Sequence, residues 1–248
     1  MSFRVEQADP LILLRDLPDG WAQTCVTSPP RDVPVAYLLA VLDEVHRVLR
    51  ADGTVWLILA RGGNAHDLIW ALRDTRWVRP FPASATPRHV LLLTKHPVFL
   101  FRAPYPLTRV FSTHGSAHAG SPLGRAPGHD RRCCRMPRRA WCIPASGMGG
   151  IPPKEVLDWC VLAGTVPCAC EICGAPSQQS VSYRERWRST CTHKGIRGRC
   201  LVIDPFCETG ETGIAAVSRG RHYLGITPNP INAEAARTRL ANLFERAR

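Results

Sequence analysis

The sequence predicts an α/β protein built on a doubly wound, mostly parallel sheet, and three observations lead to this fold class. Short apolar runs rich in β-branched residues alternate with stretches whose apolar residues recur at helical spacing. After Pro153 this order repeats as helix, strand, helix, strand and helix, and it closes one half of such a sheet. A chain of 248 residues suits one domain with an insertion, with no internal repeat.

The N-terminal part of the chain supplies the first strands and helices. Residues 25–27 form a short buried strand that ends at residues 28–30, because the two prolines there continue neither a helix nor a central strand. Residues 35–49 are apolar at helical spacing, and residues 52–53 close that helix. The continuous run TVWLIL at 54–59 is typical of a strand covered on both faces.

The next elements are a helix and a hairpin. Asn64 is expected to cap a helix that reaches Arg73. Residues 90–94 and 98–102 flank the turn at 95–97, and this arrangement predicts an antiparallel hairpin.

The C-terminal part is again regular. Pro153 suits the first turn of a helix. The elements expected after it are a helix, a strand, a helix, a strand and a long helix, at residues 154–163, 200–203, 212–219, 222–226 and 230–246.

Composition restricts the partners and the compartment. The formal net charge is +12, which predicts a polyanionic partner, with nucleic acid ahead of an anionic membrane surface. No apolar run approaches the roughly 20 residues that span a bilayer, and the first residues lack a signal-peptide core, so a cytoplasmic protein is expected. Eleven cysteines without a secretion signal favour metal binding or simple burial over disulfides.

A glycine-bearing loop between a predicted strand and helix is the first candidate site. It reads DPFCETGETG at residues 204–213. A ligand at the carboxyl end of a parallel strand meets helix N-terminal amides there. Gly210 and Gly213 allow close backbone approach, and Thr209 and Thr212 offer hydroxyls. Many α/β proteins carry such a loop as a plain structural turn, so this loop alone decides nothing.

The turn Ser28-Pro29-Pro30 is the second candidate site. Two prolines stiffen its backbone and hold the Ser28 hydroxyl and nearby carbonyls as fixed acceptors. An aromatic amino group is a poor nucleophile because its lone pair is delocalised into the ring. Acceptors aimed at its protons favour a pyramidal nitrogen, so catalysis here would rest on positioning and electrostatics. In isolation, a Ser-Pro-Pro segment is most often only a turn.

Taken together, the two segments resemble the amino-methyltransferases of DNA, in the permuted class whose catalytic motif precedes the cofactor motif. Family members read like TSPPY early and DPFAGSGTTG late, followed by a strand such as IGIEINP. The matching segments here are TSPPR at 27–31, DPFCETGETG at 204–213 and LGITPNP at 224–230. Further similarity lies at residues 91–102, 140–146 and 152–164, in the same order. The resemblance covers most of the chain apart from its arginine-rich middle.

The resemblance implies a Rossmann-like methyltransferase fold and a DNA methyltransferase that uses S-adenosylmethionine on duplex DNA, as in restriction-modification systems. Ser28, Pro29 and Pro30 would accept from the amino group of a base that leaves the stack. The cofactor-binding residues it implies are Asp204, Phe206, Thr209, Gly210, Thr212 and Thr227. Serine at the first catalytic position favours N4 of cytosine, with N6 of adenine as the second target. A homodimer is left open.

Four departures from the family pattern lie near this site. Arg31 replaces an aromatic residue that stacks on the flipped base, although a guanidinium plane can partly substitute. Glu208 replaces a glycine, Thr227 replaces an acidic ribose ligand, and residues 61–63 replace a small polar turn. The alternative is therefore a weakened or inactive methyltransferase-fold protein that still binds DNA. An RNA or small-molecule methyltransferase is disfavoured by the motif order.

A cysteine-bearing insertion over residues 167–199 carries a candidate metal site. Cys170 and Cys173 precede a glycine in a knuckle, and Cys191 and His193 follow after a basic stretch, so four soft ligands in two pairs predict a tetrahedral structural zinc site. Cys168 is a substitute ligand, and a knuckle without metal is the alternative. Bound zinc would hold a basic finger against DNA, with Arg184, Arg186, Arg188 and Lys194.

The arginine-rich middle is the expected target-recognition region. The arginines expected to contact DNA, together with Arg31, are Arg131, Arg132, Arg135, Arg138 and Arg139. A basic linker is the plainer interpretation. Three parts follow: a catalytic half over residues 1–102, a basic target-recognition loop over 103–150, and a cofactor-binding half over 151–248.

Overall fold

The computed structural model describes residues 2–60, 65–77, 88–95, 154–179, 187–193 and 198–246. A six-stranded sheet in the order β1-β8-β7-β2-β3-β4 forms its centre. The strands are β1 (Phe3–Gln7), β2 (Ala22–Thr27), β3 (Leu49–Ala60), β4 (Arg88–Thr94), β7 (Leu201–Asp204) and β8 (His222–Thr227). All neighbouring pairs are parallel except β3 and β4, which are antiparallel. The doubly wound, mostly parallel sheet is therefore confirmed.

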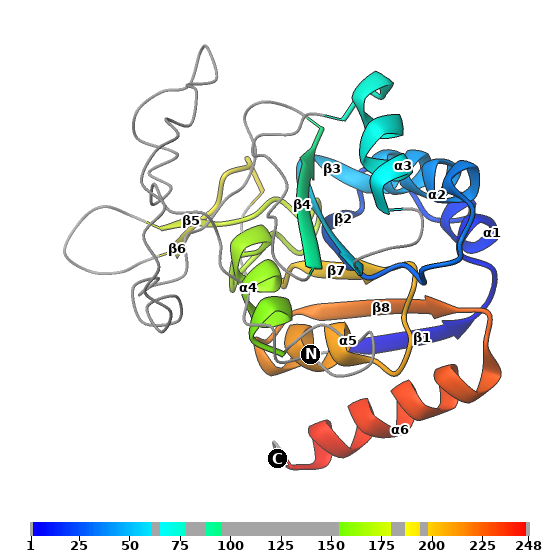
Figure 1. The fold of residues 1–248 in the computed structure, drawn as a ribbon. Helices are drawn as coiled ribbons and strands as arrows, with labels where there is room; N and C mark the ends of the chain where they lie inside the picture. The colour runs from blue at the N-terminus through cyan, green and yellow to red at the C-terminus, as the bar shows by residue number, and fades with distance from the viewer. Residues whose placement is uncertain are drawn as a thin grey trace, which may run out of the picture.

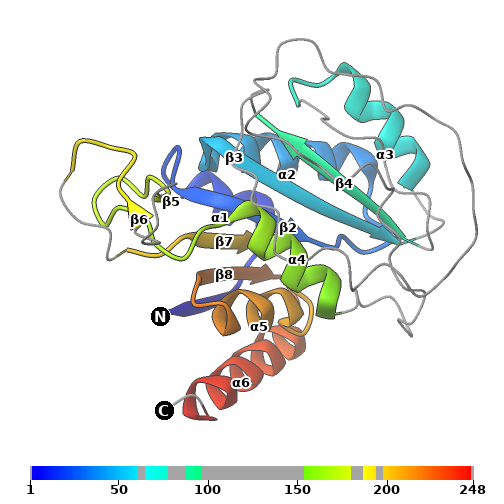
Figure 2. The same ribbon diagram turned by 90° about the vertical axis from the view of Figure 1, so that its left-hand side faces the viewer.

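Helices cover both faces of this sheet (Figures 1 and 2). The helices are α1 (Pro10–Arg15), α2 (Val35–Val48), α3 (Ala65–Ala71) with a 3-10 turn at Leu72–Asp74, α4 (Lys154–Gly164), α5 (Glu211–Ser218) and α6 (Pro230–Arg246). The first three pack on one face and the last three on the other. Parallel strands need such crossover helices, and covering both faces buries the strands completely.

The alternation of side chains along β3 shows how one apolar run serves both cores. Val55, Leu57 and Leu59 belong to the core beneath α1, α2 and α3. Trp56 and Ile58 belong to the opposite core, beneath α4, α5 and α6. Successive side chains of a strand point to opposite faces, so the continuous TVWLIL run is the pattern that a doubly covered strand requires.

Two elements near the N-terminus were not predicted from the sequence. Strand β1 pairs with β8 at the sheet edge, and α1 follows it directly. The start of α1 is well defined, because the Asp9 carboxylate accepts hydrogen bonds from the amides of Leu11 and Ile12 and Pro10 occupies the first turn. Both elements are short, five and six residues, which leaves too few positions for a periodic pattern.

One expected boundary is wrong. Residues 52–53 do not close α2, which ends at Val48, because Leu49 already has extended backbone angles. They lie inside β3, where the register against β2 moves from Ala22 opposite Leu49 to Thr24 opposite Thr54. The turn-like Asp52-Gly53 pair therefore marks an irregularity in a strand and not a helix end.

The described partner of β4 is β3, so the antiparallel pair at this edge involves residues 88–94 and 54–60. Asn64 and residues 98–102, with the second half of the expected hairpin, lie outside the described residues. In the cysteine-bearing insertion, β5 (Gln178–Gln179) and β6 (Trp187–Arg188) form a small antiparallel pair beside the main sheet (Figure 1). Among the described residues, no helix combines the length and the apolar character that crossing a bilayer would need.

Candidate functional site

The Ser28-Pro29-Pro30 turn and the glycine-bearing loop meet at the carboxyl ends of two central strands. β2 and β7 are parallel neighbours, with Thr24 opposite Val202 and Cys25 opposite Ile203. Their carboxyl ends therefore lie side by side, and the Thr27 hydroxyl donates a 2.6 Å hydrogen bond to Asp204 Oδ1. This contact joins the strand before the Ser28-Pro29-Pro30 turn to the strand before the glycine-bearing loop.

Asp204 is the centre of a buried polar network. Its carboxylate accepts from the Thr27 hydroxyl, from the Phe206 amide at 3.2 Å and from the Tyr223 hydroxyl at 3.4 Å. A hydrogen bond from Thr212 also reaches it. Complete burial raises the pKa of Asp204 to about 6, although these hydrogen bonds partly oppose the shift. The residue thus anchors the loop with a buried carboxyl group whose pKa is about 6.

Ser28 is half-buried, and its one hydroxyl proton already has a partner. Ser28 Oγ donates a 3.0 Å hydrogen bond to the Ile58 carbonyl on β3. The oxygen can therefore only accept from any further group. Pro29 is buried and Pro30 is exposed, and the Pro30 carbonyl accepts from the Val33 amide at 3.4 Å, which closes the turn.

The two glycines of the loop serve different purposes. Gly210 precedes α5 with a φ of 85°, in the left-handed region that other residues rarely adopt, and no side chain caps the helix there. Gly213 lies inside α5 against Tyr223, and a Cβ atom at this position would lie 2.6 Å from the Tyr223 ring. At Gly210 no side chain caps the first amides of α5, so these amides remain available to a ligand. Gly213 instead permits close packing of α5 against β8.

The threonine hydroxyls near the loop are engaged by the protein itself. Thr209 donates to the Glu211 carboxylate at 2.9 Å, and the buried Thr227 hydroxyl accepts from the Asn229 amide at 3.3 Å. Arg239 on α6 holds the loop through Glu211 at 2.5 Å and the Thr209 carbonyl at 2.7 Å. Sequence reasoning missed Arg239, because a cation far along the chain carries no local signal of such a contact.

Tyr223 was missed for the same reason. Its ring fills the space that Gly213 leaves, and its hydroxyl reaches Asp204. Burial, together with the nearby Cys207 and Asp204, raises its pKa well above the usual range. A tyrosine near the start of a mostly apolar strand gives no sequence sign that its hydroxyl is a polar partner.

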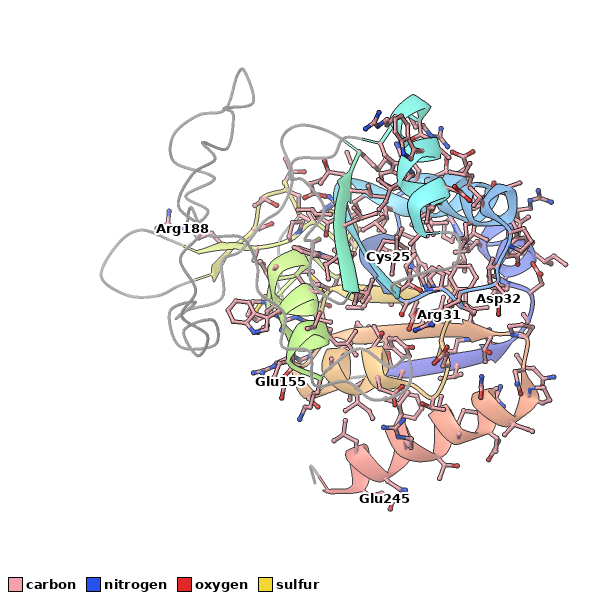
Figure 3. The ribbon with its side chains drawn as sticks, viewed as in Figure 1. Cys25, Arg31, Asp32, Glu155, Arg188 and Glu245 are labelled. Atoms are coloured by element: carbon pink, nitrogen blue, oxygen red, sulfur yellow. The ribbon has the colours of Figure 1, made fainter. Side chains whose placement is uncertain are left out.

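The remaining expected residues are placed unevenly. Phe206 is partly buried and packs on the core beneath α1, α2 and α3. Arg31 is exposed on the loop that follows β2, at the carboxyl-terminal edge of the sheet (Figure 3). Glu208 is also exposed, so its carboxylate does not fill the loop interior. Outside the described residues lie Arg131, Arg132, Arg135, Arg138, Arg139, Arg184, Arg186 and Lys194.

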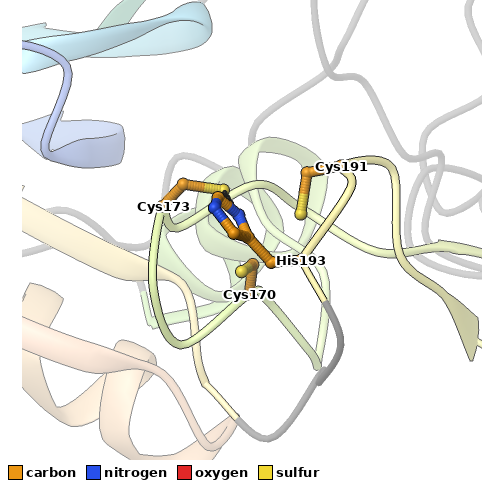
Figure 4. A group of neighbouring side chains, drawn as sticks. All are labelled: Cys170, Cys173, Cys191 and His193. Atoms are coloured by element: carbon orange, nitrogen blue, oxygen red, sulfur yellow. Dashed lines mark hydrogen bonds between the residues drawn. The ribbon is translucent and has the colours of Figure 1, made fainter.

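The cysteine-bearing insertion brings four potential metal ligands together. The side-chain ligand atoms of Cys170, Cys173, Cys191 and His193 all lie within 4.8 Å of one another (Figure 4). This group could hold a metal ion, and its composition of three thiols and one imidazole suits zinc. Gln23 and Arg50, near the starts of β2 and β3, contact the Gly174 and Cys173 carbonyls, so the group lies at the amino-terminal ends of these strands.

The sheet and its carboxyl-edge loops define an α/β protein with a Rossmann-like methyltransferase fold, and solved structures carry the same architecture. TTHA0409 of Thermus thermophilus, a proposed DNA modification methylase solved with S-adenosyl-L-methionine, matches 97% of this chain and 94% of its own, at 19% identity and a TM-score of 0.58. M1.HpyAVI matches 97% of this chain and 99% of its own, at 14% identity and a TM-score of 0.55.

A third solved structure with this fold is the PvuII DNA methyltransferase, described as cytosine-N4-specific. It matches 99% of this chain and 92% of its own, at 13% identity and a TM-score of 0.56. No family model matches the sequence, and no curated protein matches it. At these identities the likeness is one of fold.

Proposed function

We propose that this protein is a DNA methyltransferase that transfers a methyl group from S-adenosylmethionine to an exocyclic amino group of a base. The observation that carries the proposal is the hydrogen bond between Thr27 and Asp204, which fixes the Ser-Pro-Pro turn beside the glycine-bearing loop. Methyl transfer between two bound groups requires that both be held close together in the correct orientation. The folds of TTHA0409 and the PvuII enzyme support the same conclusion.

The geometry of Ser28 suits an amino nucleophile. Because its proton is given to the Ile58 carbonyl, the hydroxyl oxygen presents lone pairs only. An amino group of a base would donate to this oxygen and to a backbone carbonyl of the proline turn. Both contacts favour a pyramidal nitrogen whose lone pair is free to attack. A turn held by two prolines keeps these acceptors preorganised, so they need little rearrangement during the reaction.

The chemistry of the glycine-bearing loop fits the cofactor in part. Gly210 turns the backbone so that the first amides of α5 are uncapped by any side chain, and a cofactor carrying a carboxylate can be bound by such amides. Phe206 and Thr227 flank this edge, whereas Thr209 is already bonded to Glu211. When bound, S-adenosylmethionine supplies an activated methyl group on a sulfonium. The chain's own contribution is to hold the two reactants and to exclude other acceptors.

Cytosine N4 is the preferred target and adenine N6 the second. The preference rests on the serine at position 28 and gains support from the PvuII enzyme, which is described as cytosine-N4-specific. We propose duplex DNA as the substrate, because a net charge of +12 matches a polyanion. We further propose that Arg31 contacts the DNA near the target base, since it is exposed beside the turn.

Methyl transfer from labelled S-adenosylmethionine to unmethylated genomic DNA tests the proposal. The wild-type protein should incorporate label, and nucleoside mass spectrometry should identify N4-methylcytosine. Ser28→Ala removes one acceptor and should lower the rate about a hundredfold or more. Ser218→Ala, at an exposed position at the end of α5, serves as the matched control. Equal incorporation by the Ser28→Ala and wild-type proteins would remove Ser28 from the mechanism.

One observation favours a DNA-binding protein without activity as the second candidate. Thr227 replaces an acidic residue, and its hydroxyl already accepts from the Asn229 amide. A neutral, engaged hydroxyl offers less to a ribose than a carboxylate does. Calorimetry separates the candidates, because an enzyme should bind S-adenosylmethionine at micromolar concentrations. Duplex binding without detectable cofactor binding would establish the second candidate.

A further inference from the structure

The knuckle formed by residues 168–176 has the backbone geometry of a preformed metal-binding turn. The Ile172 amide donates to Cys170 Sγ at 3.4 Å, and backbone amides two residues on also donate to Cys173 and Cys191. Gly174 has a φ of 65°, and its amide donates to the Cys170 carbonyl at 3.0 Å. Backbone amides that point at ligand sulfurs act as outer hydrogen bonds that orient those ligands toward a metal ion.

The spacing of the four ligand atoms suits a tetrahedral zinc centre. Bond lengths of about 2.3 Å to sulfur and 2.0 Å to nitrogen place neighbouring ligand atoms about 3.6 to 3.8 Å apart. His193 Nδ1 lies 3.3 Å from Cys173 Sγ, and no pair of ligand atoms exceeds 4.8 Å. Small side-chain movements therefore complete the geometry. Four protein ligands leave no open position, which is the pattern of a structural and not a catalytic site.

Two side chains of the main sheet hold this knuckle directly. Gln23 on β2 is buried, and its amide nitrogen donates a 2.6 Å bond to the Gly174 carbonyl while its amide oxygen accepts from the Leu201 amide at 2.5 Å. Arg50 on β3 donates a 2.6 Å bond to the Cys173 carbonyl. A Cβ atom on Gly174 would lie 2.8 Å from the Gln23 amide nitrogen, so this glycine is required for the contact.

We propose that Cys170, Cys173, Cys191 and His193 bind one structural Zn²⁺ ion, and that the zinc knuckle fastens the insertion to the amino-terminal ends of β2, β3 and β7 through Gln23 and Arg50. Zn²⁺ with three thiolates and a neutral imidazole carries a net negative charge, which the Arg50 guanidinium complements. The site is independent of the proposed methyl transfer, because Gln23 and Arg50 lie near the starts of β2 and β3, whereas Ser28 follows the carboxyl end of β2.

Metal analysis of the purified full-length chain tests the ligand set. The wild-type protein should contain about one zinc per chain. Cys170→Ser, Cys173→Ser, Cys191→Ser and His193→Ala should each lose most of it. Cys168→Ser is the matched control, because Cys168 lies two residues before Cys170 and outside the four-residue group, and it should retain the metal. Loss of zinc in Cys168→Ser but not in Cys191→Ser would overturn the assignment.

Cobalt substitution keeps the proposal testable if a ligand variant fails to fold. Wild-type protein stripped of metal and loaded with Co²⁺ should show the intense visible bands of tetrahedral cobalt, together with a thiolate charge-transfer band. These bands should not change when free imidazole is added, because no coordination position is open. A weak octahedral spectrum, or bands that shift with imidazole, would refute a closed site of three thiolates and one imidazole.

The fastening role has a separate readout in thermal stability. Zinc chelation should lower the thermal midpoint of the wild-type protein by several degrees, since metal binding to the folded state adds to its stability. Gln23→Ala and Arg50→Ala should keep their zinc, and chelation should lower their midpoints less than it lowers the wild-type midpoint. Equal chelation-induced shifts in these variants and in wild type would show that the knuckle is not fastened to the sheet through these side chains.

Discussion

The buried carboxyl group of Asp204 makes the stability of the folded protein depend on pH. Its pKa of about 6 lies above the usual value for an aspartate, so the folded protein binds the proton more tightly than the unfolded chain does. Between about pH 4 and pH 6, the folded state carries more of this proton, and stability falls as the pH rises. Above that window the charged carboxylate is a constant penalty. Its contribution is therefore most unfavourable at neutral pH and is relieved on acidification.

Asp204→Asn should remove this pH dependence. An asparagine oxygen can still accept from Thr27 and from the Phe206 amide, so the loop keeps its anchor. The free energy of unfolding of the variant minus that of wild type should be about 1 kcal/mol more favourable at about pH 7.5 than at about pH 5. Urea denaturation at the two pH values measures this difference. Asp32→Asn, which removes an exposed carboxylate near the carboxyl ends of the strands, is the control substitution (Figure 3).

The sequence pointed to Asp204 but not to its partners. The resemblance to DNA amino-methyltransferases implied a cofactor-binding role for Asp204 in this loop. Tyr223 and Arg239 contact the loop from β8 and α6, and pairing at that distance in sequence is decided by packing. The hydrogen bond from Thr209 to Glu211 could not be predicted either, because the partner of a hydroxyl depends on the backbone conformation around it.

At the scale of elements, Arg47 shows how one side chain joins two helices. It lies in the last turn of α2 and donates 2.7 Å bonds to the Leu14 carbonyl in the last turn of α1 and to the Leu17 carbonyl two residues beyond that helix. The terminal carbonyls of a helix have no partner within the helix. The planar guanidinium reaches both at once, and it also pairs with Glu44 and Asp19. The end of the short helix α1 is thus stabilised by the Arg47 guanidinium of α2.

Arg47→Ala should lower the free energy of unfolding by about 2 kcal/mol, because the Leu14 and Leu17 carbonyls lose this charged donor. Arg47→Lys should recover less than half of the loss, since one ammonium group cannot span both carbonyls. Urea denaturation at neutral pH provides the measurement. Arg15→Ala, an exposed arginine in the last turn of α1, is the control and should change stability little. Equal effects of the Arg47→Ala and Arg15→Ala substitutions would contradict this role.

Long elements were predicted well, whereas the short β1 and α1 were not predicted. Helices α2 and α6 match the sequence expectation to within a residue, because many turns of one apolar stripe average out local exceptions. The run TVWLIL at residues 54–59 of β3 was found because it is continuously rich in residues typical of a buried strand. Strand β1 has an edge position and a half-exposed pattern, so its sequence carries little of the signal that central strands carry. Pairing with β8, which only the folded chain provides, decides its conformation.

For the whole molecule, the net charge of +12 leads to a prediction about DNA binding. Affinity for duplex DNA should fall steeply with salt, because each neutralised phosphate releases counterions. Replacing the five arginines of the middle segment by serine should reduce the slope of log affinity against log salt by up to about 4 to 5 units. The five positions are Arg131, Arg132, Arg135, Arg138 and Arg139.

Fluorescence anisotropy with a labelled duplex, repeated over a series of salt concentrations, measures this slope. An exposed cation at the far edge of the molecule, removed by Arg4→Ser at the start of β1, provides the comparison. It should change the slope by about one unit at most. An unchanged slope in the five-residue variant would exclude these arginines from the phosphate contacts and would leave the basic-linker interpretation.

The outer elements of the fold have a consequence for chain connectivity. β1 begins and α6 ends on the same side of the molecule in both ribbon views (Figures 1 and 2). A short flexible linker could therefore close the chain into a ring, which could be reopened within residues 103–150. The rearranged protein would encode Gly210 before Ser28 and should melt near the wild-type temperature. The order of the two segments along the chain would then not matter for their meeting, because the pairing of β2 with β7 alone would bring them together.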